Sequence, residues 1–209
     1  MKIIVFDLEC YANVFLVCAH DIELTTDVSF EISDRHDQRA ELVQWFVEVN
    51  KTSVLLGFNN HLYDNLMLDK ALDLIYQPKA QFLWQLKQYN DQIFALASAR
   101  NKWQEAFMIK RDALKSFNSI DVYRLSSGVS SLKGAALLMN DPDIQELPIP
   151  PHELVPAERL DELRQYCQRD VDITHRLWQK LQEYGVVDAR KILCDLGFLS
   201  PEGSLKHLS

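Results

Sequence analysis

The amino-acid sequence predicts an α/β fold in which helices flank a mixed sheet. Three observations support this class: a buried first strand, two strands that follow it after short polar turns, and a helical stretch leading to another buried strand. Strands joined by short turns pair in antiparallel fashion. We therefore expect a three-strand antiparallel meander, extended by further parallel strands.

Hydrophobic patterns place the first elements. Residues 3–6 form an apolar run rich in β-branched side chains, which is typical of a strand buried on both faces. Residues 14–20 and 26–32 are the next two strands. Apolar residues recur at helical spacing through 40–49, and 52–58 is the following buried strand.

Two shorter elements are expected in the second half of the chain. Residues 116–125 have strand character, with Asp121 inside the strand. Residues 130–140 read as a short helix, and a serine hydroxyl at Ser130 or Ser131 would cap its first turn.

A proline-rich connector precedes the longest predicted helix. Five of the seven prolines lie within 141–156, so this segment is expected to be extended. Residues 157–185 carry a continuous apolar stripe at helical spacing. The expected organisation is one domain over 1–185, with a helical insertion at 77–117, and a separate C-terminal segment over 186–209.

Composition narrows the function classes. The chain has 209 residues and a net charge of −8, which argues against a protein that coats nucleic acid through a broad basic face. Its four cysteines form no C-x-x-C pair, so we expect reduced packing residues rather than a zinc site. No apolar run reaches membrane-spanning length and no signal peptide is recognisable, which predicts a cytoplasmic, intracellular protein without membrane contact.

Asp7 and Glu9 follow the first buried strand. Residues two apart on a strand share a face, so both carboxylates are expected side by side. Carboxylates held this close repel unless a cation or a proton lies between them. They are interpreted as half of a metal site, and two solvated loop acids are the alternative.

Two further pairs of polar residues lie on predicted helices. Asn60 and Asp64 could both sit at a helix N-terminus, where backbone N–H groups favour anions, or Asp64 could be a plain first-turn acid. Tyr166 and Asp170 are four residues apart on the long helix and therefore share one face, beside its apolar stripe. The carboxylate of Asp170 would be half-buried on this face, and a metal ion shared with Asp7 and Glu9 would offset the cost of burying its charge.

Three motifs occur in order along the chain: F-D-L-E at 6–9, N-H-L-Y-D at 60–64 and Y-C-Q-R-D at 166–170. Together they resemble the exonuclease motifs of the DEDD superfamily. The tyrosine four residues before the last aspartate is similar to the DEDDy branch, which includes proofreading exonucleases of family A and B DNA polymerases. Gln165 stands where the DEDDh branch has histidine. The resemblance implies a ribonuclease-H-like fold, and it is nearest to phage-type polymerase exonuclease domains.

The resemblance implies a two-ion site for Mg²⁺ or Mn²⁺. Asp7, Glu9 and Asp170 would hold one ion, while Asp7 would bridge to a second ion supported by Asp64, directly or through water. Two such cations can activate a water and neutralise the scissile phosphate. Tyr166, as a phenol, is a poor general base, and its expected role is to orient the attacking water.

Substrate contacts are expected from three places. Asn60 matches an asparagine that contacts the terminal nucleotide in the family, and Lys133 would face a phosphate unless it is an ordinary surface lysine. Residues 100–117 interleave cations with aromatic side chains, the composition of a single-strand path, although an amphipathic helix with a basic face fits equally. The contacts expected from this segment are Lys102, Trp103 and Arg111.

The expected function is metal-dependent 3′–5′ exonuclease activity that releases nucleoside monophosphates from single-stranded DNA, in proofreading or replication. An RNA or short-oligonucleotide exonuclease of the same fold, and a binding module that does not cleave, are the alternatives. The resemblance also implies a phage-encoded source and a DNA polymerase or another replication protein as partner. The segment 186–209 would fold back on the domain or dock such a partner.

Overall fold

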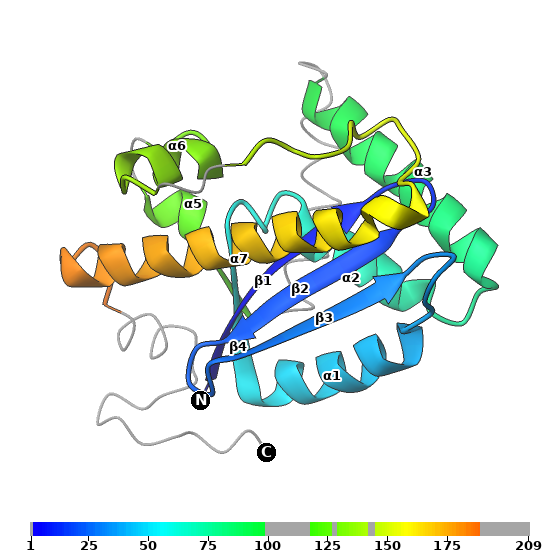
Figure 1. Cartoon of the computed structure of the whole chain (residues 1–209). Helices are drawn as coiled ribbons and strands as arrows, with labels where there is room; N and C mark the ends of the chain where they lie inside the picture. Colours follow the sequence, from blue (N-terminus) through cyan, green and yellow to red (C-terminus); the bar gives the residue numbers. More distant parts are fainter. Residues whose placement is uncertain (1, 99–117, 127–128, 142–144, 189–209) are drawn as a thin grey trace.

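The computed structural model describes residues 2–98, 118–126, 129–141 and 145–188 (Figure 1). Its sheet has five strands in the order β3-β2-β1-β4-β5. The strands are β1 (Lys2–Cys10), β2 (Phe15–Asp21), β3 (Thr26–Ile32), β4 (Ser53–Gly57) and β5 (Ser119–Asp121). The helices are α1 (Arg39–Thr52), α2 (Asp64–Asp73), α3 (Lys79–Ser98), α5 (Val122–Leu125), α6 (Leu132–Leu138), the short 3₁₀ helix η1 (Ala157–Arg159) and α7 (Leu160–Glu183).

The central strand β1 separates the two kinds of pairing. β1 pairs antiparallel with β2, and β2 pairs antiparallel with β3. On the other side β1 pairs parallel with β4, and β4 pairs parallel with β5. The predicted α/β class, with its antiparallel meander and added parallel strands, is therefore confirmed.

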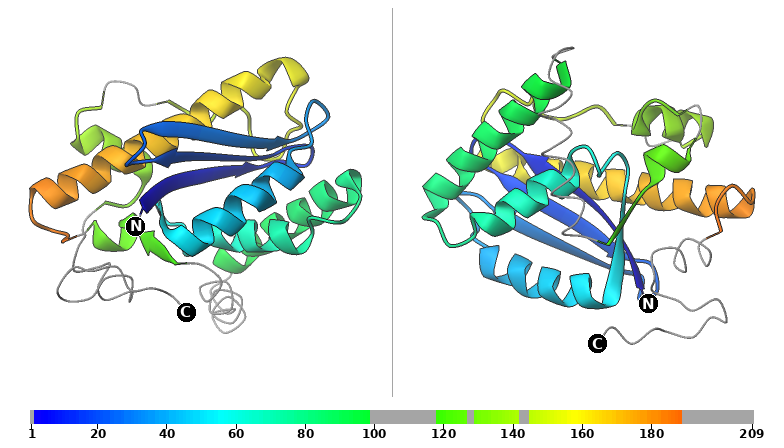
Figure 2. Two further views of the ribbon diagram at one scale, coloured as in Figure 1. Left: turned by 90° about the horizontal axis from the view of Figure 1, so that it is seen from below. Right: turned by 180° about the vertical axis from the view of Figure 1, so that it is seen from behind.

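Helices cover both faces of the sheet. Helix α7 lies across one face, and α1, α2 and α3 lie on the other (Figures 1 and 2). The side chains of β1 alternate accordingly: Ile4 and Phe6 pack with α1, α2 and α3, whereas Val5 packs with α7. Each face of the sheet thus has its own apolar core, as a strand without an exposed face requires.

The fifth strand differs from its prediction. It ends at Asp121, and residues 122–125 form α5 instead of continuing the strand. The reason is local, because the carboxylate of Asp121 accepts a hydrogen bond from the backbone N–H of Tyr123. An aspartate at this position caps a helix and ends the strand.

The remaining elements follow their predictions where the structure describes them. Ser131 caps α6 by accepting from the Gly134 N–H, and described residues 145–156 are extended or turn-like. After α7 the chain turns at Gly185, whose φ of +66° favours glycine. Residues 99–117 of the expected insertion and residues 189–209 of the C-terminal segment lie outside the described residues. Among the described helices, none has the length and hydropathy needed to cross a membrane.

Candidate metal centre

Asp7 and Glu9 lie where β1 extends past its parallel neighbour. Only Lys2–Val5 of β1 pair with β4, whereas β1 pairs with β2 as far as Cys10. Both acids continue the register of Val5, so they share the face that α7 covers. The carboxyl ends of parallel strands are the usual ligand sites of α/β sheets. The overhang leaves one side of both acids open to the loop after β4.

Helix α7 brings Asp170 to the same place. One turn earlier, the buried thiol of Cys167 contacts Asp7, with its sulfur 3.5 Å from the backbone oxygen and 3.6 Å from Oδ2. This packing sets the rotation of α7 over β1. As a result, one carboxylate oxygen from each of Asp7, Glu9 and Asp170 lies within 4.8 Å of the others.

Asp64 reaches the centre from the opposite face of the sheet. It is the first residue of α2, only 5% exposed, and its carboxylate accepts hydrogen bonds from its own N–H and from that of Leu8. A carboxylate in the first turn also interacts favourably with the helix dipole. Asp64 lines the same pocket as Asp7, Glu9 and Asp170, although it stands outside their tight group.

Burial raises the pKa values of all four acids, and repulsion between neighbouring acids adds to it for Asp7, Glu9 and Asp64. Burial, followed by repulsion from Asp64, Asp170 and Glu9, raises the pKa of Asp7 well above its usual range. Burial is also the main reason that the pKa of Glu9 rises to about 8, that of Asp64 to about 7 and that of Asp170 to about 6. Four ionised carboxylates are therefore unfavourable here without a cation.

This donor set fits a hard divalent cation. Mg²⁺ and Mn²⁺ prefer carboxylate oxygens and water as ligands, and the crowded oxygens of Asp7, Glu9 and Asp170 offer three such ligands. A bound cation would offset the repulsion that raises the pKa values. The three oxygens of Asp7, Glu9 and Asp170 could therefore hold one metal ion, and Asp64 lines the same pocket.

Tyr166 lies one turn before Asp170 on α7. Its hydroxyl donates a hydrogen bond to the carboxylate of Asp170. Burial, together with the charges of Asp170 and Glu9, raises the pKa of Tyr166 well above its usual range, so the phenol stays protonated. It can therefore donate or relay a hydrogen bond, but it cannot act as a strong base.

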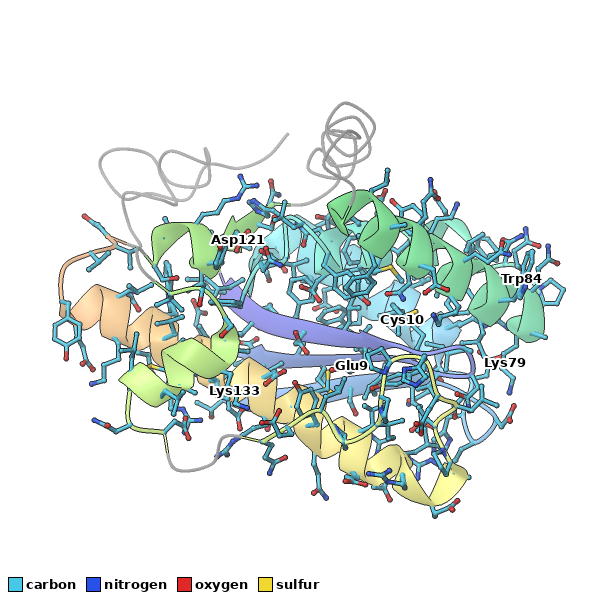
Figure 3. The ribbon with its side chains drawn as sticks, turned by 90° about the horizontal axis from the view of Figure 1, so that it is seen from above. Glu9, Cys10, Lys79, Trp84, Asp121 and Lys133 are labelled. Atoms are coloured by element: carbon cyan, nitrogen blue, oxygen red, sulfur yellow. The ribbon has the colours of Figure 1, made fainter. Side chains whose placement is uncertain are left out.

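The carboxylates line a pocket of about 700 Å³. Figure 3 shows Glu9 between α3 and α7, and residues of α3 and from the start of α6 complete the pocket wall. The volume falls within the range of sites that hold small ligands. One wall of the pocket is thus charged, and the wall formed by α3 is largely apolar.

Asn60 does not line this pocket. Its side chain is 0% exposed and its amide donates to Asn65, 3.4 Å away. Gly57 permits this placement, because a Cβ there would come within 2.7 Å of Asn60. The neighbouring Asn59 takes the position in the pocket wall, with a φ of 60° and its N–H bonded to Asp121.

Lys133, another predicted substrate contact, does not line the pocket either. Lys133 lies on α6 (Figure 3), where it pairs with Glu146 at the surface, the alternative foreseen for it. The pocket wall instead takes Ser131 and Leu132, the two residues that precede Lys133. Three predictions fall outside the described residues: Lys102, Trp103 and Arg111.

Sequence reasoning missed the contribution of α3. The side chains of Asn90, Ile93 and Phe94 line the pocket. Helical spacing within residues 79–98 indicates a helix, but it does not show which face meets the end of β1. Asn90 and Phe94 are four residues apart and therefore share one face of the helix. This spacing indicates a pocket wall only when the position of α3 beside β1 is known.

Comparisons of the chain with protein-family models, with curated proteins and with solved structures gave no match.

Proposed function

We propose that the chain is a metal-dependent 3′–5′ exonuclease with a ribonuclease-H-like fold, which releases nucleoside 5′-monophosphates from single-stranded DNA. One observation carries the proposal. Asp7, Glu9 and Asp170 converge from the central strand and from α7 on one pocket, and Asp64 joins them from α2. Buried acids with raised pKa values in a pocket are typical of functional sites.

The sheet and the motifs support the reaction class. The order β3-β2-β1-β4-β5, with β1 central and carrying two acids at its carboxyl end, is compatible with a ribonuclease-H-like layout. The resemblance of the three motifs to DEDDy exonucleases supports the 3′ polarity and the monophosphate product.

The residues would share the work as follows. Asp7, Glu9 and Asp170 would hold one Mg²⁺ or Mn²⁺ and Asp64 would support a second, and these ions would supply charge neutralisation and a more acidic water. Tyr166, kept protonated, would orient the attacking water through its hydroxyl. That water would add to the phosphorus between the last two nucleotides. The bond from this phosphorus to the 3′-oxygen of the penultimate nucleotide would break at the same time. The pocket would exclude bulk water from the terminal nucleotide.

The test uses 5′-labelled DNA and RNA single strands of the same sequence, incubated with the protein and Mg²⁺, Mn²⁺ or EDTA. We expect the DNA to shorten stepwise from its 3′ end with either metal and to stay intact in EDTA. Asp170→Asn should reduce the rate at least about a hundredfold, because it removes a metal ligand. Asp172→Asn is the matched control on the same helix, since its carboxylate accepts from Gln168 and lies outside the pocket wall.

Three results would contradict the proposal. Intact strands in both metals, with binding retained, would indicate a module that binds without cleaving. Shortening of RNA alone would change the substrate. Full activity of Asp170→Asn would show that the nuclease centre lies elsewhere.

A further inference from the structure

Aromatic side chains from α3 and from the loop before α2 line the same pocket as the carboxylates. Phe94, on α3, lines the pocket and remains 54% exposed. Its ring centroid lies 5.5 Å from that of Tyr63, at an interplanar angle of 44°. An aromatic ring so exposed beside charged groups is costly to hydrate, and it suits a ligand with a flat face.

A buried hydrogen bond holds this wall in place. The hydroxyl of Tyr63 donates to Oδ1 of Asn90, 2.7 Å away, and Asn90 is only 3% exposed. The Asn90 amide donates in turn to Asp91, which pairs with Lys87 one turn earlier on α3. The ring of Tyr63 therefore has a fixed position against Phe94, and the wall is preorganised for a ligand.

The ligand must suit both walls of one pocket. A phosphodiester meets the carboxylate wall through divalent cations, and the group beside it then meets α3. Ile93 and Leu96 make that wall apolar next to Phe94, so a sugar or a charged group would be disfavoured there. A nucleobase has the required flat face and lies one sugar away from the phosphate.

We propose that Phe94 is the stacking platform for the terminal nucleobase of the substrate, and that Asn90 is a positioning residue for Tyr63. The proposal rests on the proposed nuclease function and assigns two residues of α3 that would hold the terminal nucleotide at its site.

The experiment compares two single strands that differ only at the 3′ terminus, one ending in adenosine and one in an abasic analogue. The wild type should prefer the adenosine strand in kcat/KM by about five- to a hundredfold, the range of one base–aromatic stack. Phe94→Ala should bring this preference close to one, while Phe94→Tyr should retain it. Asn90→Ala should weaken the preference and raise KM more than it lowers kcat.

Trp84→Ala is the matched control. Trp84 is an aromatic residue of the same helix with a similar exposure of 57%, and it lies away from Glu9 (Figure 3). Its loss should leave the preference unchanged. Thermal unfolding checks that each variant folds. We expect Phe94→Ala to fold, because the side chain that it removes is half exposed.

A binding measurement separates this proposal from the nuclease proposal. With Ca²⁺ in place of Mg²⁺, a strand ending in 2-aminopurine should lose fluorescence on binding to the wild type, and not on binding to Phe94→Ala. Quenching without any cleavage in Mg²⁺ would support the stack and overturn the nuclease. Cleavage with an unchanged adenosine preference in Phe94→Ala would overturn the stack alone. Neither cleavage nor quenching would overturn both.

Discussion

The hydrogen bond from Tyr166 to Asp170 decides what each group can do. It orients the carboxylate, and it opposes the burial that raises the pKa of Asp170. Conversely, burial and the nearby acids keep the phenol protonated. Tyr166 is therefore a hydrogen-bond donor to Asp170, and neither group resembles the neutral base that a histidine would supply.

Tyr166→Phe separates these roles. The substitution keeps the ring and removes only the hydroxyl, so we expect kcat to fall about ten- to a thousandfold, less than for loss of a metal ligand. Single-turnover cleavage of the labelled DNA measures it. Tyr184→Phe, at the exposed end of α7, is the control. A loss as large as that of Asp170→Asn would mean that the hydroxyl does more than orient water.

The direction of a side chain was predictable from the sequence where the periodicity of an element governs it. The two-residue repeat of a strand puts Asp7 and Glu9 on one face, and the four-residue step of a helix puts Tyr166 beside Asp170. Turns have no such repeat. The left-handed conformation of Asn59 directs that residue to the pocket and Asn60 to the interior, and the sequence does not indicate this.

At the scale of elements, an ion-pair cluster ties α7 to the meander. Glu31, on β3 and 1% exposed, accepts hydrogen bonds from Arg35 and from Arg164 of α7, 2.8 and 2.5 Å away, and from Ser33. This cluster holds the first turns of α7 close to the sheet. It lies next to the turn that presents Tyr166.

Glu31→Gln should weaken this tie. Removing the charge leaves Arg35 and Arg164 with only the exposed carboxylate of Asp161 as a shared anion, so we expect a loss of about 1–3 kcal/mol in the free energy of unfolding. Urea denaturation measures the loss, and Glu41→Gln on the exposed surface of α1 is the control. Equal stability of the two variants would show that packing alone fixes α7.

Elements were predictable in proportion to their length. The apolar stripe of α7 and the run in β1 bury many side chains, and these patterns identify both elements. The strand β5 has only three residues, and the cap at Asp121 makes the last four residues of the predicted strand helical, as α5. The face that α3 presents depends on tertiary packing, which no local pattern contains.

At the scale of the molecule, the fold gathers the four acids of the pocket at the carboxyl end of the central strand β1, where their mutual repulsion is greatest. Three carboxyl-bearing elements meet there: β1 packs in the apolar cores on both faces of the sheet, α2 packs in one of these cores, and α7 packs in the other. Packing keeps the acids together although repulsion opposes it. The site therefore stores free energy that a cation or protons can release, and stability becomes coupled to both.

This coupling predicts that the stability of the protein in EDTA falls as the pH rises. Glu9, Asp64 and Asp170 titrate at about 8, 7 and 6 in the folded protein, against ordinary pKa values of 4.5 for Glu and 3.8 for Asp. Between these limits the folded state binds more protons than the unfolded state, so stability falls as pH rises. We expect Tm to fall by at least about 3 °C between roughly pH 5 and pH 8, the effect of one unit of pKa difference.

Divalent metal should reverse that trend, because a cation replaces the protons and binds the ionised carboxylates. In calorimetric scans, the increase in Tm that Mg²⁺ causes should become larger as the pH rises. Binding of Mg²⁺ should also release protons. Glu9→Gln removes one repelling charge, so in EDTA it should flatten the fall in Tm and raise Tm at high pH, while losing most of the response to Mg²⁺. Glu23→Gln, exposed in the turn after β2, should behave as the wild type. A Tm that rises with pH in EDTA would show that these acids are ionised and compensated by the protein itself, and the metal centre would lose its physical basis.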